Sequence, residues 1–160
     1  MDNDEALTLA AALCERFEGV RLRPYLCPAG VPTVGVGSTR YEDGTHVTLA
    51  DPPITRERAT QLLMWELSRV CLPAVRSLCP GQPPNVEAAL LDFAYNCGVG
   101  ALRASTLRKR VNAGDMDGAT TELAKWVRGG GRVLPGLVKR RAAEALLMCA
   151  GAELATEAVG

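Results

Sequence analysis

Residues 20–50 interrupt a chain that is otherwise patterned for helices, and this contrast restricts the fold more than any other feature. Before the interruption, apolar residues recur at helical spacing from Leu7 to Phe17, and Gly19 is a natural end for that helix. The interruption itself holds several Gly, Pro and Thr residues with short Val-containing alternations, which predict a small antiparallel sheet. The sequence therefore predicts an α+β fold that is mainly α-helical.

After the sheet, apolar spacing predicts a long helix over about residues 59–78, which Pro73 should kink or divide. A Pro-rich linker follows, and Asn85 is expected to be the N-cap of a helix that runs to Cys97. Shorter helices are expected near residues 104–112, 116–127 and 136–149.

Length and net charge place few limits on function. A chain of 160 residues is long enough for one domain with a buried core, and 18 Lys and Arg residues balance 18 Asp and Glu residues. The charge is uneven along the chain, because residues 101–141 hold ten basic side chains and three acidic ones. Such a basic half either faces a polyanion, for example nucleic acid, or is a solvated helix surface, and the pattern leaves both interpretations open.

The cysteines and the first apolar stretch bear on the compartment in which the protein works. The six cysteines are irregularly spaced without a C-x-x-C pair, so we expect free thiols in a reducing compartment and no structural zinc. The apolar stretch at residues 6–13 is too short to span a bilayer, and it follows acidic residues, unlike a secretory leader. We therefore expect no transmembrane segment, metal or cofactor.

Three polar residues near the start of the interruption form a candidate catalytic site. Glu18 falls in the last turn of the first helix, Cys27 follows after eight intervening residues, and Thr33 after five more. The free carbonyls at a helix end disfavour an ionised carboxylate, which suits Glu18 to the role of a general acid near neutral pH. Each residue alone also has an ordinary interpretation, such as an exposed acid or a strand threonine. Together they indicate a site that handles one proton and one water.

Longer motifs occur in order along the chain. They are Phe17-Glu18-Gly19, Arg21-x-x-x-Tyr25, Gly30-Val-Pro-Thr-Val-Gly-Val-Gly37, Ile54-Thr55-Arg56-Glu57-x-Ala59-x-x-Leu62-Leu63, Leu91-x-Phe93-Ala94-Tyr95-Asn96-x-Gly98-x-Gly100, Ser105-Thr106-Leu107, Asn112-x-Gly114-Asp115, Trp126, and Gly136-Leu137-x-x-Arg140-Arg141-x-x-Glu144. In their order and spacing, these motifs resemble the phage-type lysozymes of glycoside hydrolase family 24 over about residues 7–150.

The resemblance implies a lysozyme-like fold of two lobes within a single catalytic domain, residues 1–151. The expected parts are a small lobe with the sheet at about 18–55, an interlobe helix at about 56–79, a helical lobe at about 83–150 and a flexible tail at 152–160. It also implies a peptidoglycan muramidase for bacterial cell lysis. Such an enzyme hydrolyses the β-1,4 bond between N-acetylmuramic acid and N-acetylglucosamine.

By the same resemblance, Glu18 protonates the leaving glycosidic oxygen, while Cys27 and Thr33 position the attacking water. The family most often has Asp at the position of Cys27, although Cys also occurs there. A thiol leaves three roles open, namely a base, a thiolate nucleophile and a holder of water. A base gives inversion and a nucleophile gives retention, and we expect the base or water-positioning role. Ser38 is a second departure, because many relatives have His there.

Arg140 and Arg141 are candidate substrate-binding residues. Three roles are open for them: they neutralise Glu18 across the cleft, they contact the anionic stem peptides, or they are solvated residues of a helix surface. Trp65 and Trp126 either stack on sugar rings or pack in the core.

The expected partner is bacterial peptidoglycan, bound by a monomer, with no role for nucleic acid. We expect the protein to remain in the host cytoplasm until a holin releases it to the peptidoglycan layer. Three alternatives stay open: a lytic transglycosylase acting on the same bond, a non-catalytic cell-wall-binding module, and a helical nucleic-acid-binding protein.

Overall fold

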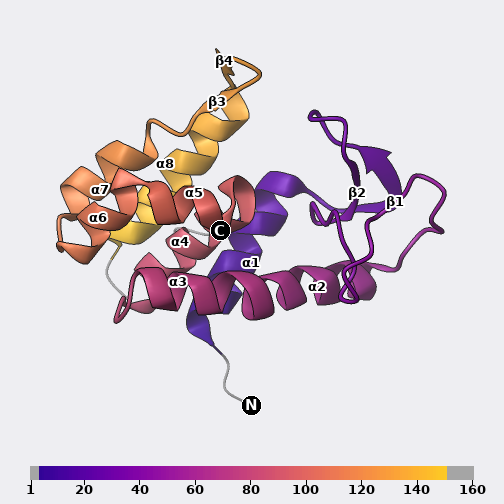
Figure 1. Ribbon diagram of the computed structural model, residues 1–160, viewed down its shortest axis with the longest axis horizontal. Coiled ribbons are helices and arrows are strands. Elements are labelled where there is room, and N and C mark those ends of the chain that lie inside the picture. Colours follow the sequence, from indigo (N-terminus) through magenta and orange to yellow (C-terminus); the bar gives the residue numbers. More distant parts are fainter. Residues whose placement is uncertain (1–3, 151–160) are drawn as a thin grey trace.

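The computed structural model describes residues 4–150, and helices make up most of this range (Figure 1). Helix α1 (Glu5–Glu18) leads into the antiparallel strands β1 (Arg21–Leu26) and β2 (Pro32–Gly35). The elements that follow are α2 (Arg56–Trp65), a π-helical segment (Glu66–Cys71), α3 (Leu72–Leu78), α4 (Pro84–Cys97), α5 (Val99–Ala104), α6 (Thr106–Asn112), α7 (Met116–Leu123), the strands β3 (Arg128–Gly129) and β4 (Arg132–Val133), and α8 (Pro135–Cys149). The predicted mainly helical α+β fold is confirmed. The tail predicted at 152–160 lies outside the described residues.

Helix α1 begins and ends where its sequence predicts. The side chain of Asp4 accepts a hydrogen bond from the backbone N–H of Leu7, which satisfies a free donor at the start of the helix. Gly19 ends it with φ +70°, a conformation that glycine adopts without strain. Glu18 is therefore the last helical residue, beside the turn into the sheet.

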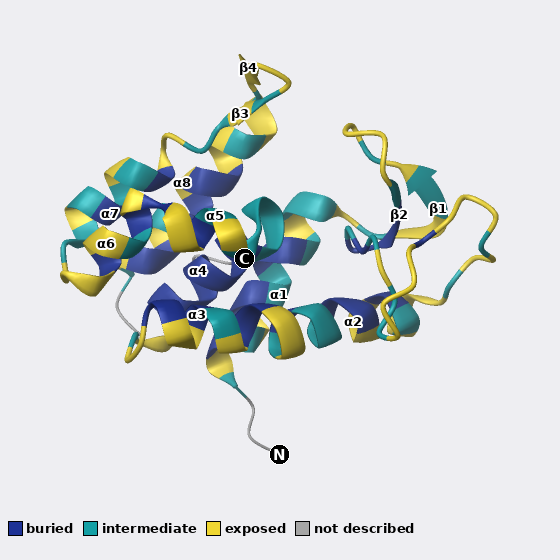
Figure 2. Cartoon of the chain, in the orientation of Figure 1, coloured by how far each residue is buried: buried dark blue, intermediate teal, exposed yellow. Residues whose placement is uncertain are grey.

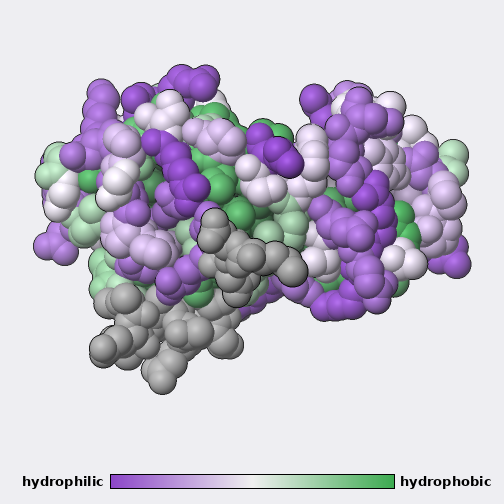
Figure 3. Space-filling view, turned by 90° about the horizontal axis from the view of Figure 1, so that it is seen from below, coloured by the Kyte–Doolittle hydropathy of each residue, from purple (hydrophilic) through white to green (hydrophobic). Residues whose placement is uncertain are grey.

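Helix α4 is the centre of the main core. Its residues from 85 to 94 are buried on all sides, and α1 and α8 pack against it, as the dark blue interior in Figure 2 shows. A second and much smaller cluster of Val34, Val47 and Leu62 seats the β1–β2 hairpin on α2. The two clusters correspond to the two masses in the space-filling view of Figure 3, which are joined by a narrower waist.

The rod of α2, the π-helical segment and α3 runs between these two masses, and the predicted division near Pro73 is confirmed (Figure 1). Proline lacks an N–H, and its ring crowds the carbonyl four residues earlier in an α-helix. A π-helical segment stands immediately before it, and the N–H of Leu72 donates to the carbonyl of Leu67, five residues back. The wider turn accommodates the proline ring without ending the rod.

The prediction that Asn85 is an N-cap is wrong. The helix has Pro83 at its N-cap, and Asn85 lies buried inside the first turn. Its side-chain amide instead donates to the carbonyls of Leu147, Met148 and Ala150, at 3.1, 3.2 and 2.6 Å. Asn85 therefore caps the carboxyl end of α8, where the last carbonyls lack helical partners.

Two short elements were missed, and one helix is shorter than predicted. Helix α5 occupies the segment after Gly98, and α7 ends at Leu123 rather than 127. The β3–β4 hairpin turns at Gly130 and Gly131, whose φ angles of +58° and +82° match the two-residue turns that favour hairpins. The run of three glycines at 129–131 was a signal for this turn.

Candidate active site

A cleft of about 980 Å³ lies between the small lobe and the helical lobe. It is lined by the end of α1, the β1–β2 hairpin and the loop after it, the middle of the rod, and the end of α4. All three residues of the predicted catalytic set, Glu18, Cys27 and Thr33, are among its lining. Two separate elements thus bring these residues together.

Glu18 lies between a guanidinium group and a backbone segment. Its Oε1 accepts a hydrogen bond of 2.5 Å from Nη1 of Arg140, and a quarter of its side chain remains exposed. On the other side, a Cβ added to Gly37 would lie 3.1 Å from both Cδ and Oε2 of Glu18. The carboxyl group is therefore fixed from two directions while one side stays open to the cleft.

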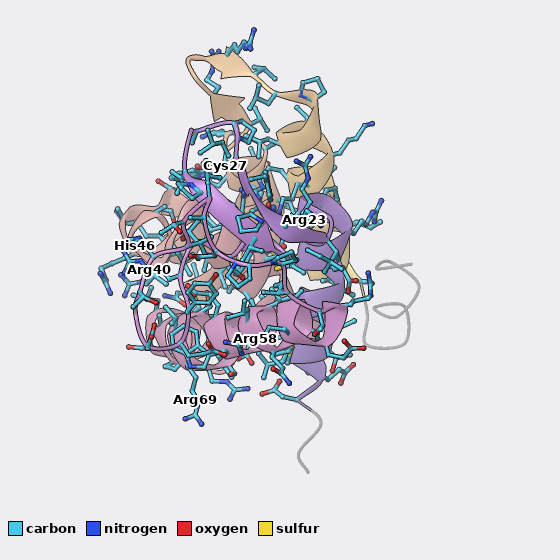
Figure 4. All side chains as sticks on the ribbon, turned by 90° about the vertical axis from the view of Figure 1, so that its right-hand side faces the viewer. Arg23, Cys27, Arg40, His46, Arg58 and Arg69 are labelled. Carbon is cyan, nitrogen blue, oxygen red and sulfur yellow. The ribbon has the colours of Figure 1, made fainter. Side chains whose placement is uncertain are left out.

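Cys27 lies at the end of β1, where the chain makes a tight turn. Its N–H donates to the carbonyl of Val31 at 3.0 Å, and its carbonyl accepts from the N–H of Gly30 at 2.8 Å. Figure 4 shows Cys27 at the end of the small lobe that is farthest from Arg58 on α2. The backbone thus presents this thiol at the rim of the lobe and not in a core.

Hydrogen bonds to the sulfur favour the ionised form of Cys27. Hydrogen bonding from the backbone of Val31, then from the backbone of Ala29 and the hydroxyl of Thr33, lowers the pKa of the Cys27 thiol below its ordinary value. Thr33 is itself buried on β2, and its Oγ1 also lies 2.9 Å from the carbonyl oxygen of Val31. The thiol and the hydroxyl therefore form one polar group at the cleft wall.

Arg140 and Arg141 are both buried, with 3% and 1% exposure, so the solvated-surface interpretation is wrong for each. Arg140 donates to Glu18 and clamps the carboxylate of Asp92 through Nε and Nη2, at 2.9 and 2.8 Å. Arg141 donates to Asn96, which lines the cleft, and to Glu144, each at 2.8 Å. Neither guanidinium lines the cleft, so the structure gives no support to a direct substrate contact by these arginines.

Sequence reasoning missed two residues of α4 that lie against this site. Asp92 holds Arg140, and the hydroxyl of Tyr95 donates to the carbonyl of Val36 at 2.5 Å, which ties α4 to the small lobe. Burial raises the pKa of Tyr95 far above its ordinary value, so this hydroxyl stays a donor. A signal for Asp92 existed, because a charged residue stands within the apolar stripe of the helix.

The structure places the two tryptophans in different surroundings. Trp126 packs edge-to-face on Phe93, with ring centroids 5.2 Å apart, and belongs to the main core. Trp65 lines the cleft. Within residues 4–150, His, Cys, Asp and Glu side chains do not gather in threes as a metal site requires. Over the same range, none of the helices has the length and apolar character to cross a bilayer.

Known proteins similar to this chain define its family. The family model described as phage lysozyme matches residues 15–144. An endolysin of Acyrthosiphon pisum secondary endosymbiont phage 1 is 36% identical over 139 residues, which covers 84% of this chain and 91% of that protein. The chain therefore belongs to the phage lysozyme family, as its motifs predict.

Solved structures agree with this assignment. The endolysin from Escherichia coli O157:H7 phage FAHEc1 has a TM-score of 0.79 and 31% identity, and the match covers 88% of this chain and 90% of that one. The muramidase domain of SpmX from Asticaccaulis excentricus has a TM-score of 0.74 and 28% identity, over 89% of this chain and 95% of that one. The fold around the cleft is thus shared with lysozymes and muramidases.

Proposed function

We propose that this protein is a muramidase, a lysozyme-type glycosidase that hydrolyses the β-1,4 bond between N-acetylmuramic acid and N-acetylglucosamine in peptidoglycan. Membership of the phage lysozyme family supports a peptidoglycan-hydrolysing lysozyme. The observation that carries the proposal is the convergence of Glu18, Cys27 and Thr33 in one cleft, although they come from a helix and a separate hairpin.

Glu18 is the proposed general acid. Its carboxyl group donates a proton to the glycosidic oxygen as the bond to the leaving sugar breaks. The carboxylate that results keeps its hydrogen bond from Arg140, which offsets the charge that Glu18 acquires. The absence of a side chain at Gly37 leaves room for the other oxygen, because a Cβ there would lie 3.1 Å from Oε2.

Cys27 and Thr33 are proposed to manage the water. The hydroxyl of Thr33 orients a water molecule, and the thiolate of Cys27 accepts its proton as the oxygen attacks the anomeric carbon. The lowered pKa of Cys27 supports this role, because more of the thiol is ionised at a given pH than in an ordinary cysteine. A base predicts inversion at the anomeric carbon, so proton NMR of the first-formed sugar anomer tests the role. A retained anomer would indicate a covalent thiolate mechanism instead.

A water-handling pair also favours hydrolysis over lytic transglycosylation, which needs no added water. Mass analysis of released muropeptides distinguishes the two reactions, since transglycosylation leaves anhydro-muramic ends that lack one water. We expect ordinary reducing ends, and anhydro ends would contradict a hydrolase.

The experiment that tests the enzyme itself compares Glu18→Gln with Glu15→Gln. Both positions are on the last turn of α1, but Glu15 makes an exposed ion pair with Arg56 instead of entering the cleft. We expect the first variant to bind cell walls without clearing them and the second to clear them at the wild-type rate. Unchanged clearing by the first variant would defeat the enzyme proposal in favour of a wall-binding module.

The structure weakens the nucleic-acid alternative. Two of the ten basic residues in 101–141, Arg140 and Arg141, are buried against carboxylates, and Arg110 and Lys125 form ion pairs with Asp115 and Glu122. Steep salt-dependent DNA binding combined with no clearing of cell walls would restore this alternative.

We further propose that the protein acts as a monomer and waits in the host cytoplasm until a holin opens the membrane. The apolar stretch at 6–13 supports the holin-dependent route, because Leu9, Ala10 and Leu13 in this stretch are buried in the core of the lysozyme fold. Expression in a bacterial host tests the route: cultures should lyse only after the inner membrane is permeabilised, and spontaneous lysis would contradict it. Light scattering at the monomer mass of 17.0 kDa checks the oligomeric state.

A further inference from the structure

Four ionisable side chains are buried behind Glu18, where helices α4 and α8 meet. Asp92, Arg140, Arg141 and Glu144 are each at most 3% exposed. Burying an ionised group without a partner is strongly destabilising, because the group loses its hydration and gains nothing in return. Each of these four groups therefore needs a partner or has to be neutral. The contacts between them show which groups are ionised and which one is neutral.

Asp92 fixes the guanidinium of Arg140. Two nitrogens of Arg140 bind the two oxygens of Asp92 in a planar, two-bond clamp, and only Nη1 is left to reach Glu18. Burial alone would raise the pKa of Asp92, but the hydrogen bonds and charge of Arg140 outweigh it and hold that pKa low. Asp92 is therefore an ionised partner that takes up most of the hydrogen bonding of Arg140.

Glu144 has the opposite environment. One oxygen, Oε1, accepts a hydrogen bond from Arg141, whereas Oε2 would be a buried oxygen without a donor among residues 4–150 if the group were ionised. Burial, followed by the neighbouring Asp92, raises the pKa of Glu144 well above its ordinary value. A proton on Glu144 removes the cost of an ionised oxygen that is buried without a donor. Glu144 is therefore the neutral member of the two carboxyl groups.

Other titratable and charged groups lie near Glu18 or face the cleft. Burial is the main cause that raises the pKa values of Cys14 on α1, Tyr25 on β1 and Tyr95 on α4, so all three are neutral near pH 7. Besides Glu18 and the tyrosines, the charged or ionisable residues of the lining are Arg21, Cys27, Arg40, Glu42, Asp43 and Glu66. Within residues 4–150, Arg140 is the charged side chain that hydrogen-bonds Glu18 directly, and Asp92 shares that guanidinium.

We propose that Asp92 and Glu144 are positioning residues for Glu18: Asp92 is a carboxylate that clamps Arg140 and leaves it a single hydrogen bond for Glu18, and Glu144 is a neutral carboxylic acid beside Asp92. This inference rests on the proposed acid role of Glu18. Asp92 offsets the charge of Arg140, so that the guanidinium does not act on Glu18 as an uncompensated cation. The same clamp fixes the direction from which Nη1 of Arg140 meets the Glu18 carboxyl group.

The first test is the pH dependence of cell-wall hydrolysis in Asp92→Asn. The amide keeps the shape but removes the charge, so Arg140 acts on Glu18 alone. We expect the alkaline limb of the profile to move to lower pH, because an uncompensated cation favours the ionised form of a neighbouring acid. Asp117→Asn, an exposed change of the same charge on α7, should leave the profile in place. An unshifted alkaline limb in Asp92→Asn would overturn the proposal.

Glu144→Gln is the matched variant. Its amide can donate to Asp92 and accept from Arg141 as the carboxylic acid does, without any change of charge if Glu144 is neutral. We therefore expect its alkaline limb to coincide with that of the wild type, whatever its maximal rate. A downward shift like that of Asp92→Asn would mean that Glu144 is ionised, which overturns the proposal.

Infrared difference spectroscopy tests the proton without any activity measurement. At neutral pH the wild type should show the carbonyl band of a buried protonated carboxyl group, sensitive to deuteration, and Glu144→Gln should lack it. The band should persist in Glu18→Gln, so a failure of the proposed enzyme role remains separate from a failure of this inference. Absence of the band in the wild type would refute the neutral acid, even if Asp92→Asn does not fold.

Discussion

The carboxyl group of Glu18 lies against the backbone of Gly37, with no room between them for a side chain. A Cβ at Gly37 would approach Cδ and Oε2 of Glu18 to 3.1 Å, and Gly37 has φ +76°. Glu18 ends α1 and Gly37 follows β2, so this is a place where the small lobe contacts the end of α1. The position of the acid therefore depends on a residue that has no side chain.

Gly37→Ala should lower kcat far more than it lowers stability. The methyl group would push the Glu18 carboxyl group off its line to the substrate, and misplacement of a catalytic group by about 1 Å costs roughly 100-fold in rate. Gly114→Ala is the matched control, because its φ of +73° imposes similar backbone strain with nothing within 4 Å. Both should lose about 1 kcal/mol in urea unfolding, and equal kcat values in the two variants would contradict the contact.

Cys27 should react with iodoacetamide at lower pH than a cysteine in the unfolded chain. Its pKa is lowered, chiefly by hydrogen bonding from the backbone of Val31, so its reactive thiolate form appears at lower pH. Burial raises the pKa of the Cys71 thiol to about 12, so Cys71 should stay unmodified in the same sample. Mass spectrometry of peptides alkylated over a pH series gives both midpoints, and a Cys27 midpoint at or above the unfolded value would contradict the hydrogen-bonded turn.

Cys27→Asp should stay active and extend activity to lower pH. A base works only when ionised, so the rate rises as pH increases through its pKa, and an ordinary Asp pKa of about 3.9 is far below that of a thiol. The acidic limb of the pH–rate profile should therefore move down, whereas Cys27→Ala should lose most activity at every pH. If Cys27→Asp is as inactive as Cys27→Ala, the thiol acts as a nucleophile and not as a base.

Tyr95→Phe should destabilise the protein through a single lost hydrogen bond. The variant keeps the ring but leaves the carbonyl of Val36 without its donor, which costs about 1–3 kcal/mol for a buried group. Urea unfolding with an unchanged m-value would show that the loss comes from this bond and not from a change in compactness. Wild-type stability in this variant would show that water replaces the hydroxyl.

Asn85→Ala should be among the more destabilising polar substitutions. It removes the donor shared by the carbonyls of Leu147, Met148 and Ala150 at the end of α8, and we expect a loss of about 2–3 kcal/mol. Thermal unfolding checks the loss, with Gln82→Ala in the exposed linker as a control. A loss no larger than that of the control would refute the capping role.

Local sequence predicted most of the helices and the sheet, because each depends on periodicity or turn residues. Glu18, Cys27 and Thr33 line one cleft, and their catalytic roles stay a prediction. The N-cap of α4 was predicted wrongly because asparagine is a residue type that favours N-caps. Pro84, at the first position of the helix, already indicated that α4 begins before Asn85. The contacts of Arg140 with Asp92 and Glu18 join positions 48 and 122 residues apart. They depend on how α8 packs on α4 and α1, and no local pattern specifies that packing.

The two hydrophobic clusters have a mechanical consequence for catalysis. The acid belongs to a helix packed in the main core, whereas Cys27 belongs to a hairpin seated on the small cluster at the far end of the rod. The distance between Glu18 and Cys27 therefore depends on how the two hydrophobic clusters are placed relative to each other, and not only on the short segment of chain between the two residues. A ligand bound between the clusters would contact both of them, so its binding would affect the separation of the two proposed catalytic groups.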